Sequence, residues 1–216
     1  MEIFTAFTKR NDGNIGKREN LKKFLTKNNL ENKIPIIMDQ KHTNKVCVVD
    51  ENYKYQICDA LVTQRTDVAL FTRVADCQPI LIWDGVAGVI AAIHAGREGV
   101  YTNIFEKTLN LMNEKFKTLS ENIHVIIGPS AKKCCYEVAA ESSFHTDFVS
   151  ENFGDEFVHG KNIDLNGITL KQLLNEGIRS ENIDISNICT VCNPEKYFSY
   201  RRGDKKINFA GVISII

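Results

Sequence analysis

The chain has 216 residues, of which 43% are hydrophobic and 25% are charged, and its 27 basic residues balance its 27 acidic ones. These values are ordinary for one globular domain with one substantial core. A neutral chain has no overall field that attracts nucleic acid or an anionic membrane, so we expect neither as a partner.

The first residues lack the apolar run of a signal peptide, and no stretch approaches the roughly 18 to 20 apolar residues that span a bilayer. Seven cysteines form an odd set, which argues against a closed disulfide framework and fits reduced thiols. We therefore expect a cytoplasmic protein in which most of the cysteines are packed in the core.

The first half of the chain predicts one helix followed by strands. A helix is expected over 17–27, and strands over 34–38 and 46–49, with His42 in the polar connection between the two strands. Three apolar runs without polar alternation follow, which is typical of strands covered on both faces. These runs span 68–74, 79–84 and 86–95.

The second half mixes helices with strands. Helices are expected near 102–116, 141–153 and 168–176, and strands over 122–128, 183–189 and 208–216. Because no strict strand–helix–strand rhythm is present, we expect one α+β domain over 1–216 with mixed β-sheets layered between helices. No GxGxxG or Walker-type loop occurs, which removes the common nucleotide-binding motifs.

Cys77 and His94 are the first candidates for chemistry. They lie almost symmetrically about the turn Asp84-Gly85, so a hairpin there returns both residues to one end of the sheet. A thiolate and an imidazole at strand ends are a plausible site, although such residues more often serve packing or lie at the surface. A histidine in a polar loop, such as His42, is usually only solvated.

Several short motifs in the right order resemble the YfiH-type family, the laccase-domain proteins also described as polyphenol oxidases. The motifs begin with a histidine segment around His42 and cover most of the chain from about residue 40 onward. They are DQKHTNKV, DALVT, ADCQP, IHAGREG, GPS, YEV, and CT followed by FSYRR. Each piece is weak alone, and together they identify the chain as a member of this family.

The resemblance implies a YfiH-type α/β/β/α fold and a metal site formed by His42, Cys77 and His94. One thiolate and two imidazoles suit Zn²⁺ and leave a fourth position open for water or substrate. Copper also suits these ligands, so Cu²⁺ is the rival metal.

The family resembles purine nucleoside phosphorylases that also deaminate adenosine, so a purine nucleoside and phosphate are the expected small-molecule partners. Phosphorolysis would direct phosphate at C1′ of the ribose, and deamination would direct a metal-activated water at C6 of adenine. The oligomeric state is expected to be monomer or homodimer.

Further residues of the matching motifs are candidates for contacts with the reactants. Asp76 is a candidate catalytic residue that orients a ligand or carries a proton, or else a structural carboxylate beside the thiol. Arg201 and Arg202 are candidates for binding phosphate, because a guanidinium offers paired donors, but surface ion pairs are the alternative. Tyr136 is a candidate for stacking on the purine, although core packing would also explain it.

The chain departs from the family pattern in the glycine-rich loop after His94. An aromatic residue and a cation are usual there, and Arg97 and Glu98 replace them. Glu98 would repel a phosphate, which weakens the expectation of phosphorolysis more than that of the metal site. The N-terminal Arg-Gly-Gly element of the family is also missing.

Three other functions remain open from the sequence. They are a metal-free hydrolase with Cys77 as nucleophile and His94 as base, a copper-dependent polyphenol oxidase, and a factor that edits cell-wall (peptidoglycan) precursors. The CxxC of Cys189 and Cys192 leads into an Asn-Pro turn instead of opening a helix, so we expect packed thiols there and at Cys134-Cys135.

Overall fold

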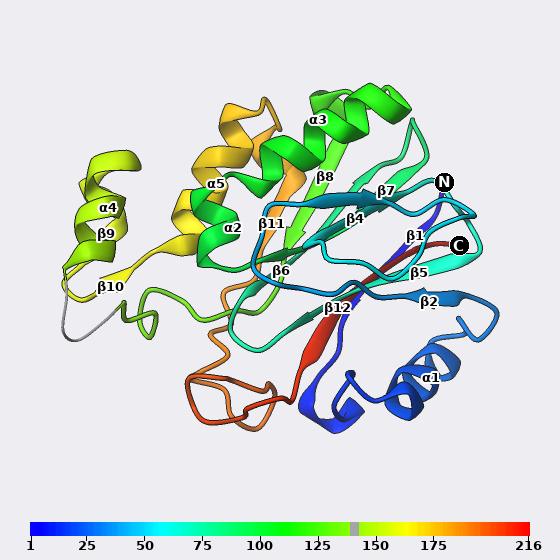
Figure 1. Ribbon diagram of the computed structural model, residues 1–216, viewed down its shortest axis with the longest axis horizontal. Helices are drawn as coiled ribbons and strands as arrows, with labels where there is room; N and C mark the ends of the chain where they lie inside the picture. The colour runs from blue at the N-terminus through cyan, green and yellow to red at the C-terminus, as the bar shows by residue number, and fades with distance from the viewer. Residues whose placement is uncertain (139–142) are drawn as a thin grey trace.

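The computed structural model describes residues 1–138 and 143–216 (Figure 1). In chain order its strands and α-helices are β1 (Ile3–Phe7), α1 (Arg18–Lys27), β2 (Ile34–Ile36), β3 (Val46–Val48), β4 (Ala60–Thr63), β5 (Val68–Val74), β6 (Gln78–Asp84), β7 (Val89–Ala95), α2 (Arg97–Tyr101), α3 (Ile104–Phe116), β8 (Ile123–Ile127), α4 (Phe144–Asn152), β9 (Val158–His159), β10 (Asn162–Ile163), α5 (Leu165–Asn175), β11 (Ile183–Ile185) and β12 (Phe209–Ile215). Short 3-10 turns lie at Arg10–Asp12, Ser120–Asn122, Asp155–Phe157 and Ser180–Asn182.

Two mixed sheets form the centre of the molecule. One has four strands in the order β1-β12-β5-β2, and the other has six in the order β11-β8-β6-β7-β4-β3. Strands β9 and β10 form a separate two-stranded ribbon. Figure 1 shows α1 on one side of the paired sheets and α3 and α5 on the opposite side.

The alternation of side chains along the buried strands explains the layers. On β5, Phe71 packs with α1, where its ring meets Phe24 edge to face, whereas Leu70 points to the core between the sheets. On β6, Leu81 joins that same inter-sheet core, and Ile80 packs in the core that contains α3 and α5. Because both faces of these strands are covered, the runs are apolar without alternation, and the predicted mixed α/β/β/α arrangement is confirmed.

The predicted hairpin is present between β6 and β7. Its register pairs Gln78 with Ala95 and Pro79 with His94, and the two strands turn around Asp84. The Asp84 carboxylate accepts hydrogen bonds from the backbone N–H groups of Val86 and Ala87, so β7 begins later than the apolar run suggests. Cys77, just before β6, therefore lies at the same end of the sheet as His94.

Several boundaries differ from the expected ones. The helix expected from about 102 is interrupted, because Asn103 adopts a left-handed conformation with φ 47° and caps α3 by accepting a hydrogen bond from the Glu106 N–H. The short helix α2 precedes this interruption. Strands β1, β4, β9 and β10 were not predicted, and all four are short, with two to five residues each. Of the helix expected over 141–153, α4 covers Phe144–Asn152, and 141 and 142 lie outside the described residues.

In the described part of the chain, none of the helices combines the length and apolar character needed to cross a membrane.

Candidate metal centre and active-site pocket

The side chains of His42, Cys77 and His94 converge, with their ligand atoms all within 4.8 Å of one another. The Cys77 Sγ and His42 Nε2 atoms are 3.7 Å apart, and the two imidazole rings meet edge to face with centroids 4.7 Å apart. The loop between β2 and β3 carries His42, the β5–β6 connection carries Cys77, and β7 carries His94. Three separate segments thus deliver one sulfur and two ring nitrogens to one point.

Asp59 holds two of the three cluster residues in place, although the sequence analysis named it only as part of the DALVT motif. Its carboxylate is fully buried, and Oδ1 lies 2.7 Å from Nδ1 of His94. A carboxylate accepts but does not donate, so His94 donates through Nδ1 and keeps its other nitrogen for the cluster. The only sequence signal for this role is a carboxylate at the start of a fully buried strand.

The same carboxylate holds the loop that carries His42. Asp59 accepts hydrogen bonds from the backbone N–H groups of His42 and Thr43, at 3.1 and 2.7 Å, and from the Thr43 hydroxyl at 2.7 Å. These bonds stabilise His42 in the left-handed region with φ 58°. Gly96 lies against the same imidazole, where a Cβ would come within 2.6 Å of His42 Cδ2.

The electrostatics favour a thiolate beside a protonated imidazole when no cation is bound. Burial raises the pKa of Cys77, but the charge of His94 and hydrogen bonds from both histidines outweigh it and bring the pKa to about 6. Burial lowers the pKa of His94, but Cys77 and Asp59 outweigh that effect and raise it to about 9. Burial also raises the pKa of Asp59, and bonds from His94 and Thr43 lower it overall to about 2.

These donor atoms fit a bound metal ion. A thiolate and two imidazoles are a ligand set that Zn²⁺ accepts, and three protein ligands leave one tetrahedral position open. An Asp–His pair behind the site is the usual support for a metal-binding histidine. The residues that would hold the ion are therefore His42, Cys77 and His94, the set predicted from the motifs.

The cluster lies in the wall of a pocket with a volume of about 630 Å³. This size suits a small organic substrate. Besides the three cluster residues, its lining includes Gln40, Arg73, Asp76, Tyr136, Tyr200, Arg201, Asp204, Lys206 and Asn208. The pocket therefore combines an aromatic wall with several cationic side chains.

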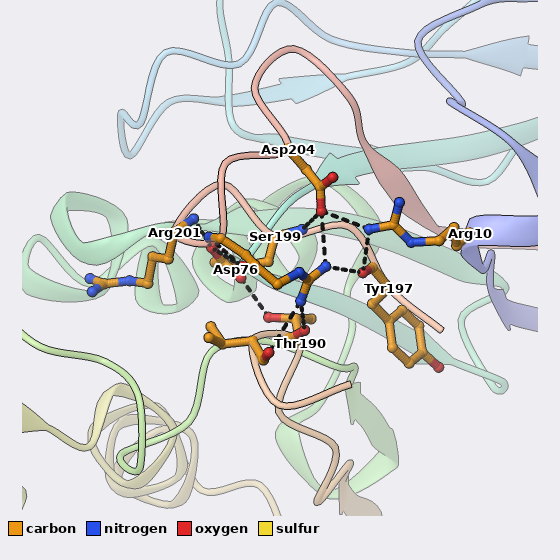
Figure 2. A network of polar contacts seen from close by, with 9 residues as sticks. Arg10, Asp76, Thr190, Tyr197, Ser199, Arg201 and Asp204 are labelled. Carbon is orange, nitrogen blue, oxygen red and sulfur yellow. Dashed lines mark hydrogen bonds and ion pairs between the residues drawn. The ribbon is translucent and has the colours of Figure 1, made fainter. Parts of the chain in front are cut away.

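Asp76 lines the pocket, but both of its oxygens are engaged by the loop before β12 and its surroundings (Figure 2). Oδ1 accepts from the Thr190 hydroxyl at 2.6 Å, and Oδ2 accepts from the Ser199 hydroxyl at 2.9 Å and the Arg201 N–H at 2.8 Å. Asp76 also has a left-handed backbone, with φ 89°. Its structural role is to attach the 190–201 segment to the loop of Cys77.

Arg201 and Tyr136 form one unit of the pocket wall. The Arg201 guanidinium stacks over the Tyr136 ring at 4.2 Å and donates to the Glu137 carbonyl at 2.8 Å. Figure 2 shows this guanidinium pointing away from the polar network that its own backbone joins. Burial and the charge of Cys77 raise the pKa of Tyr136 to about 12, so the phenol remains a hydrogen-bond donor.

Arg202 has different surroundings from its neighbour. Its guanidinium donates to the carbonyl oxygens of Thr190, Val191 and Tyr197 and to the Asp204 carboxylate. Among the described residues it is not part of the pocket lining. The structure thus places Arg201 in the pocket and Arg202 in the scaffold behind it.

Arg73 is a pocket residue that the sequence analysis did not consider. It is the one charged residue of the mostly apolar strand β5, and this charge was the available signal. One terminal nitrogen donates to the Met38 carbonyl at 2.9 Å, and its buried Nε finds no hydrogen-bond partner among the described residues. Arg97 and Glu98 pair with each other at 3.4 Å, and neither is part of the pocket lining in the described structure.

The expectation of packed thiols at four other cysteines is confirmed for Cys189, which is buried, and is wrong for Cys134 and Cys192, which are exposed. Cys134, Cys135, Cys189 and Cys192 gather with their sulfur atoms within 4.8 Å of one another. Cys134 and Cys192 are exposed, so burial does not explain them. Cys134 and Cys135 lie 58 and 57 positions before Cys192 in the chain. At that separation, the spacing of the cysteines does not predict that they meet.

Comparison with known proteins places the chain in a family. The sequence model of a family described as multi-copper polyphenol oxidoreductase laccase matches residues 7–216. A Campylobacter jejuni protein named purine nucleoside phosphorylase is 34% identical over 216 residues, which cover 98% of this chain and 90% of that protein. A Clostridium acetobutylicum protein of the same name is 34% identical over 78% of this chain and 71% of its own length.

Solved structures agree with the fold. The Bacillus licheniformis hypothetical protein YfiH has a TM-score of 0.89 at 22% identity, covering 99% of this chain and 93% of that one. YlmD from Geobacillus stearothermophilus has a TM-score of 0.86 at 22% identity, covering 98% and 91%. With the family match over almost its whole length, the chain belongs to the laccase-like YfiH family, as its motifs predicted.

Proposed function

We propose that this protein is a zinc-dependent purine nucleoside phosphorylase. The observation that carries the proposal is the three-ligand cluster in the wall of a pocket that also presents Arg73, Arg201 and Lys206. The relatives named purine nucleoside phosphorylase support the substrate class. Zn²⁺ held by His42, Cys77 and His94 would supply a Lewis acid with one open position.

In the proposed reaction, a phosphate oxygen forms a bond to C1′ of the ribose while the bond from C1′ to the purine nitrogen breaks. The products are ribose 1-phosphate and the free purine, which takes up the proton that the attacking hydrogen phosphate loses. Arg201 and Arg73 would bind the phosphate, because both line the pocket and guanidinium groups pair well with phosphate oxygens.

The aromatic part of the pocket would bind the purine. Tyr136 is held in place by the Arg201 guanidinium on its ring, and its protonated phenol can donate a hydrogen bond to a ring nitrogen or a ribose oxygen. Asp76 would act by positioning, since it attaches the segment of Arg201 to the loop of Cys77. The unfavourable Glu98 lies outside the pocket lining, which removes the main objection from the sequence.

The small number of histidines in the chain favours a zinc enzyme over a multi-copper oxidase. The chain has five histidines, and two of them are in the cluster. Of the others, His124 stacks on Trp83 and His145 lies beside Tyr101, and neither is part of the pocket lining in the described structure. A set of copper ions that reduces O₂ needs more imidazole ligands than one such pair provides.

Adenosine deamination is a second reaction that we propose for the same site. An open metal position beside a purine pocket can also support attack of water on C6, which releases ammonia and yields inosine. This activity would need no phosphate, which separates it from phosphorolysis in one assay.

The test uses protein purified without chelator and incubated with adenosine or inosine, with and without phosphate, while chromatography follows each product. Phosphate-dependent release of the free base, lost with His42→Ala or Cys77→Ala and restored by zinc after chelation, is expected. Activity that survives complete metal removal would favour the Cys–His hydrolase. No turnover of any purine nucleoside by zinc-loaded protein would refute the proposal and favour the precursor-editing role.

A further inference from the structure

The second cysteine cluster lies where two loops meet. Strands β8 and β11 are parallel neighbours, so the loops that follow them leave the sheet side by side. Cys134 and Cys135 belong to the first loop, and Cys189 and Cys192 to the second. The loops are joined by a bond from the Thr190 N–H to the Ser130 carbonyl at 3.1 Å.

The distances between sulfur atoms match a tetrahedral metal site. The Cys135 and Cys192 sulfurs are 3.3 Å apart, those of Cys134 and Cys192 are 3.9 Å apart, and all four lie within 4.8 Å. Four sulfurs at about 2.3 Å from a central Zn²⁺ would be separated by about 3.8 Å. Small movements of the side chains would therefore complete this arrangement.

A cation lies beside the cluster. The Lys132 ammonium is near Cys189 and Cys134. It is held in place by a 2.7 Å hydrogen bond to Asn166 Oδ1. A cation nearby offsets part of the charge of a four-thiolate site.

Simple packing does not account for the cluster. A buried free cysteine acts as a small apolar side chain, but Cys134 and Cys192 are exposed to solvent. Four thiolates at these separations would repel one another strongly unless a cation lay between them. A tetrahedral site of four sulfur ligands is typical of structural zinc.

We propose that Cys134, Cys135, Cys189 and Cys192 bind a second, structural Zn²⁺ that joins these two loops. The site is separate from the cluster of His42, Cys77 and His94, and it does not depend on the reaction proposed above.

The position of this site connects it to the pocket. Tyr136 directly follows Cys135, and Thr190 lies between the other two cysteines and donates to Asp76. Arg202 donates to the carbonyls of Thr190 and Val191 within the same turn. Zinc bound here would hold the loop of Tyr136 against the loop that reaches Arg201, and so preserve the pocket wall.

The test compares the zinc content of protein produced with added zinc and purified in reductant without chelator. Wild-type protein is expected to contain two zinc ions per chain. The double variant Cys134→Ser/Cys192→Ser should lose one of them, while Cys47→Ser, a half-buried cysteine outside both clusters, should keep both. The double variant should also unfold at a lower temperature, and its KM should rise more than its kcat falls.

A second variant separates this proposal from the first site. His42→Ala/Cys77→Ala is expected to retain one zinc ion, and X-ray absorption should show four sulfur neighbours around it. The proposal is refuted if this protein contains no zinc, or if Cys134→Ser/Cys192→Ser has the same zinc content as wild type. A disulfide between Cys135 and Cys192 in the reduced, zinc-supplied protein would also refute it.

Discussion

His94 Nδ1 lies 2.7 Å from Oδ1 of Asp59, and this carboxylate has no exposed surface. The pair determines which nitrogen of His94 carries its proton and which nitrogen faces Cys77. Because Asp59 also accepts bonds from the backbone of His42 and Thr43, one carboxylate positions two of the three proposed ligands.

The first prediction concerns Asp59→Asn. The amide keeps the shape but removes the charge and places an NH₂ group against donors, so zinc affinity should fall about 10- to 100-fold. Competition with a chromogenic chelator measures the affinity. Asp184→Asn, at an exposed position of β11, is the matched control and should bind zinc as wild type does. Unchanged affinity in Asp59→Asn would contradict this role.

The second prediction concerns the close approach of Gly96 to the cluster. In Gly96→Ala, the new Cβ would lie 2.6 Å from His42 Cδ2 and 3.3 Å from Cys77 Sγ, so the imidazole must move. Zinc affinity should fall about tenfold or more, because a displaced ligand no longer matches the coordination distance. Circular dichroism should remain that of the folded protein. Gly85→Ala is the control, since its Cβ would meet nothing within 4 Å.

The third prediction separates two neighbouring arginines. Arg201→Ala should raise the KM for phosphate about tenfold or more while changing the free energy of unfolding by less than about 1 kcal/mol, because its guanidinium faces the pocket. Arg202→Ala should lower the free energy of unfolding by about 2–4 kcal/mol, because three carbonyls and Asp204 each lose one donor. Steady-state kinetics and denaturant unfolding measure the two effects, and the reverse pattern would show that the assignment is wrong.

The fourth prediction is a pH dependence at Asp204. Burial raises its pKa, but the Ser199 N–H and the guanidinium groups of Arg10 and Arg202 outweigh burial and hold the pKa below its usual value. A carboxyl with a lowered folded-state pKa contributes stability above its unfolded pKa, near 4, and loses it as the pH falls through the folded value. Asp204→Asn should therefore be destabilised by about 1–3 kcal/mol at neutral pH.

The difference between wild type and Asp204→Asn should shrink as the pH falls below about 4. Urea unfolding at a series of pH values measures it. Asp184→Asn is again the control, and a difference that is constant across the acid range would contradict the prediction.

The sequence by itself determined the layered fold class and the hairpin of β6 and β7. Apolar runs without alternation require strands covered on both faces, and the turn at Asp84 returns Cys77 toward His94. The short motifs were enough to identify the family and to predict the ligand set. These properties are local in the chain, or repeat in a fixed order along it.

Only the tertiary structure decided which polar groups meet. Asp59 supports His94 from 35 positions away, Arg201 stacks on Tyr136, and Arg202 turns to the scaffold although it is the next residue. The four clustered cysteines come from two loops that adjoin because β8 and β11 are parallel neighbours. Such contacts depend on strand order and register, and the spacing of residues along the chain determines neither of them.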